Sequence, residues 1–134
     1  MNLFTSALCV HVVTAVLGFG QIIGTALLAA AIGDGPIAPP VLKTLRRLLR
    51  GTGMTLGLVL LSGVLVEWAC GGLFHDHWWF RISFLLVLAI GAINGMAFRS
   101  LRRSDPGVMR RVGISEWITL ALVGATATLM VLKP

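Results

Sequence analysis

The chain has 134 residues, of which 57% are hydrophobic and 12% are charged, and its mean hydropathy is +0.93. A soluble domain carries about twice that share of charged residues, so the composition excludes an ordinary water-soluble protein and indicates one integral membrane domain over residues 1–134. The net charge is +6, but the basic residues cluster between apolar segments without interleaved aromatic residues, which argues against nucleic-acid binding and favours contact with anionic lipid headgroups.

Four apolar segments are each long enough to cross the hydrocarbon core of a bilayer as a helix, which takes about 20 residues. They cover residues 3–30, 52–71, 79–98 and 114–132. Backbone polar groups inside a bilayer must be satisfied within a helix or a closed barrel, and alternating strands of about ten residues do not occur. The sequence therefore predicts an all-α fold, a four-helix transmembrane bundle.

The first segment carries polar residues on one face, because they recur every three or four positions. These residues are His11, Thr14, Gly18, Gln21 and Thr25. An ionisable side chain inside a membrane is costly and usually faces a bundle interior, a partner or a cofactor. We therefore expect His11 to face the interior, where a neutral imidazole can hydrogen bond to a neighbouring helix or ligate haem iron or another metal.

The Gly- and Pro-rich stretch 33–40 ends the first segment. Residues 41–50 then place leucines on one side and basic residues on the other, which predicts a short interfacial amphipathic helix between spans one and two. Along the second span, the small and apolar residues from Gly53 onwards share a face with Glu67. We expect this face to meet the polar face of the first span, so that Glu67 approaches His11 and is either paired or protonated.

Several chemically active residues follow the second span. His75, Asp76 and His77 lie in the next loop, where two imidazoles and a carboxylate can bind a soft or borderline cation such as copper. A polar loop beside an aromatic belt is the alternative interpretation. Arg81 opens the third span and can meet a haem propionate at the membrane surface.

Two further features of the spans concern packing. Three of them carry a GxxxG pair, which permits close approach between membrane helices, and Asn94 in the third span is expected to lie deep enough to pair with Gln21. The GxxxG pairs are Gly20 with Gly24, Gly53 with Gly57, and Gly91 with Gly95.

Ser115 and Glu116 are expected at the start of span four, where a hydroxyl and an acid favour a helix N-terminus.

The distribution of Lys and Arg predicts the orientation. The loops after spans one and three hold nine of these residues, whereas the opposite side holds only Arg81 and Lys133. By the positive-inside rule, both termini and the loop 71–78 face outward, to the periplasm of a bacterial inner membrane. Cys9 and Cys70 lie toward that oxidising side, and a disulfide between them is one interpretation, although their estimated depths differ by several ångströms.

Three local motifs carry a resemblance to a known group. They are H-x6-G-x-G from His11, L-x-L-x2-L-S-G from Leu56, and W-x-R-x3-L from Trp79. The chain resembles four-span bacterial membrane proteins that include the copper-resistance D-like proteins, the flavin-independent protoporphyrinogen oxidases and uncharacterised relatives. The resemblance implies porphyrin or haem chemistry at His11 and Arg81. The oxidases usually carry Lys at the position of Arg81 and Tyr-His at the position of Ile93 and Asn94, which favours an uncharacterised relative.

Three functions are compatible with the sequence. The first is an accessory or interaction subunit of an inner-membrane complex, with haem b or porphyrin bound through His11 and with Arg81 and Glu67 as further cofactor-binding residues. The second is a periplasm-facing copper-handling protein with His11, His75 and His77 as ligands. The third is a porphyrin-oxidising membrane enzyme, although no catalytic residue can be assigned. The expected partners are bilayer lipids, other membrane subunits or a second copy of the chain.

Overall fold

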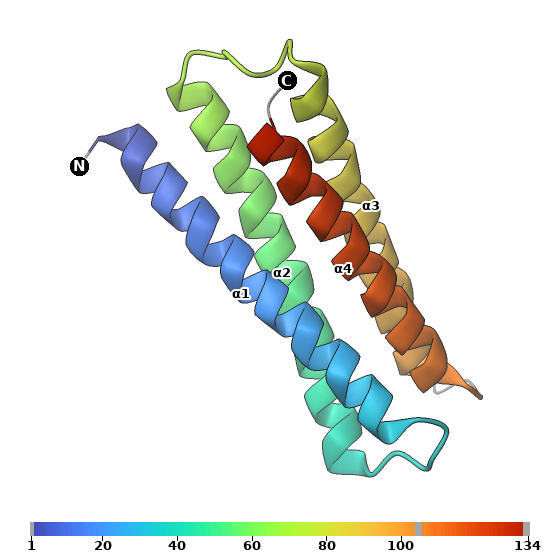
Figure 1. Ribbon diagram of the computed structural model, residues 1–134. Helices are drawn as coiled ribbons and strands as arrows, with labels where there is room; N and C mark the ends of the chain where they lie inside the picture. The colour runs from blue at the N-terminus through green and yellow to red at the C-terminus, as the bar shows by residue number, and fades with distance from the viewer. Residues whose placement is uncertain (1, 104–105, 133–134) are drawn as a thin grey trace.

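The computed structural model describes residues 2–103 and 106–132. It contains four helices that run alternately up and down: α1 (Leu3–Ile32), α2 (Pro39–Ala69), α3 (Trp78–Arg103) and α4 (Val108–Leu132), as Figure 1 shows. Each helix is long and apolar enough to cross a membrane. The predicted all-α bundle of four membrane-spanning helices is therefore confirmed.

The helices form a closed ring in which α1 packs on α2, α2 on α3, α3 on α4 and α4 on α1. The start of α1, the end of α4 and the loop between α2 and α3 lie at one end of the bundle, here called the termini end (Figure 1). The other end, here called the arginine end, holds basic residues of three helices. They are Lys43, Arg46, Arg47, Arg50, Arg99, Arg102, Arg103, Arg110 and Arg111.

The first two helices have clear boundary signals. The Asn2 side chain caps α1 by accepting a hydrogen bond of 2.8 Å from the Thr5 amide, which satisfies one of the free N–H groups of the first turn. Gly33, with φ of 58°, ends α1. Pro39 and Pro40 occupy the first turn of α2, where a missing N–H costs no hydrogen bond.

The basic segment 41–50 is helical, but it is the first part of α2 rather than a separate interfacial helix, because α2 continues without a break from Pro39 to Ala69. Gly51 and Gly53 are the helix-weakening residues near the expected junction, and each interior glycine costs about 1 kcal/mol. Packing against α1 outweighs that cost. Helix α4 likewise begins at Val108, before the expected 114, and so Glu116 lies more than two turns inside it.

The best-packed part of the interior lies at the arginine end. There Leu45, Leu49, Leu101 and Val112 are completely buried and belong to one apolar cluster. Large apolar side chains are exposed along the outside of all four helices, as expected for a surface that contacts lipid chains. The interior toward the termini end is packed less fully and contains the cavities described below.

Most of the GxxxG glycines do not mediate packing inside the bundle. A Cβ atom built on five of the six would meet nothing within 4 Å, so the prediction is wrong for these five, and only Gly53 has a neighbour. Other glycines make the close contacts, because the relative rotation of two helices decides which residues meet. The five open glycines are Gly20, Gly24, Gly57, Gly91 and Gly95.

Candidate functional site

His11 lies inside the bundle, as predicted, and its ring contacts α2. The Nδ1 atom lies 3.1 Å from the carbonyl oxygen of Val59 and 3.0 Å from the hydroxyl oxygen of Ser62. The Ser62 hydroxyl also lies within hydrogen-bond distance of the carbonyl oxygens of Leu58, at 2.7 Å, and Val59, at 3.1 Å, and a carbonyl oxygen can only accept. The geometry therefore places the proton of the neutral imidazole on Nδ1, which donates to α2.

This hydrogen bond leaves the other ring nitrogen, Nε2, with a free lone pair. A histidine that donates Nδ1–H to a backbone carbonyl is held in the orientation and tautomer in which Nε2 can ligate a metal. The ring edge rests on Gly63, where an added Cβ atom would lie 3.4 Å from Cε1 of His11. Two features of α2 thus fix the imidazole: acceptor oxygens on one side and a glycine beneath it.

A cavity of about 240 Å³ lies beside His11 and is lined by residues of all four helices. Its walls are apolar except for His11 and Thr126, and the Thr126 hydroxyl donates to the carbonyl oxygen of Leu122 at 2.9 Å. A second cavity of about 50 Å³ is also lined by His11 and Met130. The site is therefore an apolar space with one free basic nitrogen and, on α4, a thioether side chain.

Sequence reasoning did not identify Met130 as part of this site. In the structure, the same cavity is lined by His11, in the third turn of α1, and by Met130, in the last turn of α4. The start of α1 and the end of α4 therefore do not lie at the same level. To find Met130 from sequence, one would need to know which residues of α1 and α4 are in contact.

Glu67 belongs to the loop at the termini end rather than to the His11 site. Its carboxylate accepts hydrogen bonds from the backbone amides of Phe74, at 3.0 Å, and His75, at 2.8 Å. We expected Glu67 to be either paired or protonated, and the structure shows it paired with these two amides, with His75 Nδ1 also 3.4 Å from its Oε1 atom. The expected approach to His11 is not observed, because His11 contacts Val59 and Ser62, and Ser62 lies five residues, or about 7.5 Å, deeper along α2 than Glu67.

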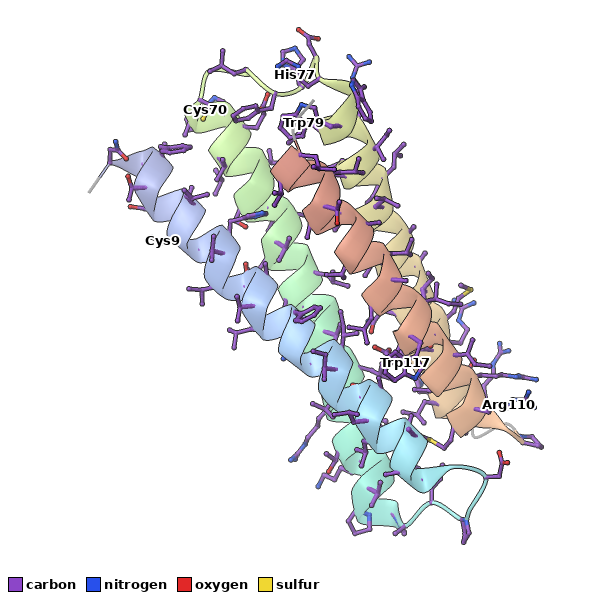
Figure 2. All side chains as sticks on the ribbon, viewed as in Figure 1. Cys9, Cys70, His77, Trp79, Arg110 and Trp117 are labelled. Carbon is purple, nitrogen blue, oxygen red and sulfur yellow. The ribbon has the colours of Figure 1, made fainter. Side chains whose placement is uncertain are left out.

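The two loop histidines have different partners. The Nδ1 atom of His75 hydrogen bonds to the carbonyl oxygen of Gly72, and its Nε2 atom lies 3.4 Å from Asp76 Oδ1. The His77 ring stacks on Trp79, with 5.7 Å between the ring centroids (Figure 2). Within residues 2–103 and 106–132, no three His, Cys, Asp or Glu side chains gather where they could hold a metal ion.

Arg81 also serves this loop. Its Nε atom donates to the carbonyl oxygen of His75 at 2.9 Å, and its Nη2 atom lies 3.6 Å from Asp76 Oδ1. Arg81 does not line either cavity beside His11, so the structure does not bring these two residues together. Cys9 and Cys70 are free thiols (Figure 2), and the alternative of a disulfide between them is not observed.

The deeper polar residues, Gln21 and Asn94, were expected to pair with each other. Instead, each of them pairs with α2. The Thr55 hydroxyl donates to Gln21 Oε1 at 3.1 Å, and Asn94 Nδ2 donates to the carbonyl oxygen of Leu49 at 3.1 Å. Helix α2 thus receives polar side chains from both of its neighbours. These contacts join α1 and α3 to α2.

No family model matches this chain, and no curated protein or solved structure matches it either. The family resemblance therefore stays a prediction. The function has to be inferred from the chemistry around His11.

Proposed function

We propose that this small integral membrane protein is an accessory subunit that binds a haem- or porphyrin-type cofactor through His11. The observation that carries the proposal is the free Nε2 atom of His11 beside an apolar cavity that Met130 also lines. Histidine and methionine are a common pair of axial ligands for haem iron, and a macrocycle needs apolar walls. A bound haem would supply one-electron redox chemistry.

The residue types around His11 suit a haem or porphyrin, but the cavity has room for only part of such a molecule. The cavity of about 240 Å³ is smaller than the range of about 300–1,000 Å³ typical of pockets for drug-sized ligands. Arg81 would bind a propionate only after releasing the loop carbonyl that it now holds.

The accessory role is supported by glycine faces that nothing covers within the bundle. Gly20 and Gly24 on α1, and Gly91 and Gly95 on α3, have open space at the Cβ position. Such GxxxG faces let a helix of another chain approach closely. The two described loops between helices are also short, so they offer no room for a separate catalytic domain. A partner subunit or a second copy would use these faces.

The test is an absorption spectrum of the purified protein, produced with adequate haem supply and recorded before and after dithionite. We expect a Soret band in the wild type, its loss in His11→Ala, and a changed spectrum in Met130→Leu. His77→Ala is the matched control, because its imidazole stacks on Trp79 outside the cavity. A wild type that shows no Soret band and binds no added haemin would contradict the proposal.

Copper(I) binding is the second candidate, because imidazole nitrogen and thioether sulfur are the soft ligands that this ion prefers. The shared cavity lining of His11 and Met130 favours it. Metal analysis separates the two: copper bound without a Soret band, and lost in both His11→Ala and Met130→Leu, would support this function. Porphyrin oxidation has less support, since His11 is the only titratable residue among the described residues that line the larger cavity.

A further inference from the structure

A layer of buried polar side chains crosses the bundle away from His11, with one residue from each helix. The exposed fractions are 0% for Thr25, 1% for Thr52, 7% for Asn94 and 1% for Glu116. None of the ion pairs among the described residues involves Glu116, since all of them lie in the loop region at the termini end. A carboxyl group is thus buried in a membrane-spanning bundle without a cationic side chain as partner.

The register of the four helices places these residues at one level. Each polar residue lies three or four positions along its helix from a residue of the apolar cluster at the arginine end. Residues at this spacing share a helix face and are one turn apart. Because the cluster residues pack together, the polar residues form the next layer. One turn further, Ile22 and Ile90 line the His11 cavity. The cluster and polar residues pair as Ala29 with Thr25, Leu49 with Thr52, Ala97 with Asn94, and Val112 with Glu116.

The layer presents more acceptor oxygens than hydrogens. The Thr25 hydroxyl donates to the carbonyl oxygen of Gln21 at 2.9 Å, and the Thr52 hydroxyl donates to that of Leu48 at 3.0 Å. Both hydroxyl oxygens therefore offer only lone pairs to the interior. In addition, Asn94 Oδ1 and Glu116 Oε2 are buried and have no hydrogen-bond partner among the described residues, and the same holds for the Thr119 hydroxyl one turn further along α4. Unpaired buried oxygens and an uncompensated carboxylate are costly, so this layer calls for a positively charged occupant.

We propose that this layer is a binding site for a small monovalent cation, Na⁺, with Glu116 as the single charged ligand and the Asn94 and threonine oxygens as neutral ligands. The donor atoms are all oxygens, which suit hard cations and not the soft ions that thiolates or imidazoles select. One carboxylate balances one positive charge, whereas a divalent ion would leave a net charge buried. Helix bundles build ion sites in this way, from facing side chains of several helices.

The packing around the layer also gives the direction of access. Toward the arginine end, Leu45, Leu49, Leu101 and Val112 are all 0% exposed and close the interior. Toward the termini end, the layer adjoins the cavity lined by Ile22, Ile90 and His11. The cation would therefore exchange through the His11 cavity. The ligand oxygens of this layer do not include His11, so the cation site is independent of the proposed function, but a ligand in the His11 cavity would slow exchange of the cation.

The first experiment measures the reaction of Glu116 with a hydrophobic carbodiimide, which modifies protonated carboxyl groups in apolar surroundings. Purified protein is labelled in sodium chloride and in choline chloride at equal ionic strength and pH, and Glu116 is followed by mass spectrometry. We expect labelling to be about tenfold slower when sodium stands at ten times its dissociation constant, because the ion and the proton compete for one carboxylate. Labelling that proceeds at the same measurable rate in both salts would overturn the proposal and leave a simply protonated Glu116.

The second experiment covers the case in which Glu116 is not labelled in either salt. The thermal unfolding midpoint is measured against sodium concentration, with choline as the replacement ion. We expect a saturable rise in the wild type, and none in Glu116→Gln or Asn94→Leu. Thr128→Val is the matched control, because its exposed hydroxyl only donates within α4, and it should respond to sodium as the wild type does. A midpoint that responds equally to sodium and choline would overturn the cation site.

Discussion

The Nδ1 atom of His11 lies 3.1 Å from the carbonyl oxygen of Val59, and this hydrogen bond joins α1 to α2. Since a carbonyl oxygen can only accept, the imidazole is the donor to Val59 and its Nε2 atom is left as a base. One contact therefore serves two purposes. It ties two membrane helices together, and it sets the tautomer in which His11 can bind a ligand.

The structural part of this role can be measured by comparing His11→Ala with Ser62→Ala. The first change removes the bond to Val59, and we expect it to lower the free energy of unfolding by about 1 kcal/mol, the usual scale of interhelical hydrogen bonds in membranes. The second change keeps that bond and should cost less. Unfolding in mixed micelles, followed by circular dichroism, gives both values. An equal loss in the two variants would mean that Ser62, not Val59, is the main acceptor.

Glu67 is expected to hold the loop at the termini end in place. Its carboxylate accepts the amides of Phe74 and His75, so Glu67→Ala removes their acceptor and should cost about 1–3 kcal/mol of stability. Glu67→Gln keeps one acceptor oxygen and should cost less. Asp34→Asn is the control, since Asp34 is an exposed residue in the loop at the other end of the bundle. Hydrogen exchange at the two amides checks the prediction, and unchanged exchange in Glu67→Ala would contradict it.

The sequence predicts the four helices because a membrane imposes a single strong requirement, a long apolar segment, on each. The ends of the helices are predicted less well. Hydropathy marks where a segment stops being apolar, but leucine, lysine and arginine are good helix formers, so α2 already contains 41–50 and α4 begins at Val108. That error also put Glu116 at a helix terminus, when it lies in the buried polar layer.

The candidate site is predicted in part for a related reason. Periodicity within one helix identifies its polar face, and so the inward orientation of His11 is correct. It does not fix how one helix is rotated or shifted against another. Three errors are of this kind, because each depends on the contact between two helices. Two are the expected pairings of His11 with Glu67 and of Gln21 with Asn94. The third is the omission of Met130 from the predicted site.

Gly51 provides a test of the observed contact between α1 and α2. A Cβ atom on Gly51 would lie 2.9 Å from Gln21 Nε2, so Gly51→Ala must displace the amide that accepts from Thr55. Gly57→Ala makes the same chemical change where nothing lies within 4 Å, and a helical alanine is favoured over glycine by up to about 1 kcal/mol. We expect Gly57→Ala to be stabilised and Gly51→Ala to lose that gain. Equal unfolding free energies in the two variants would disprove the contact.

The last prediction concerns orientation. We propose that the arginine end faces the cytoplasm and the termini end faces the periplasm, because nine Lys and Arg residues lie at the first end of the bundle and only Arg81 and Lys133 belong to the second side. Lys133 lies outside the described residues. The basic side chains at the arginine end would also contact anionic lipid headgroups of the cytoplasmic leaflet.

Cysteine labelling of intact bacterial cells tests this orientation in a background that carries Cys9→Ser and Cys70→Ser. Asp76→Cys and Asp34→Cys place one thiol in the exposed loop at each end of the bundle. A membrane-impermeant maleimide should label the Asp76→Cys protein in intact cells, and the Asp34→Cys protein only after permeabilisation. The opposite pattern would invert the topology. It would also place the His11 cavity, which lies nearer the termini end, toward the cytoplasm, so a periplasmic supply of copper or haem would no longer reach it directly.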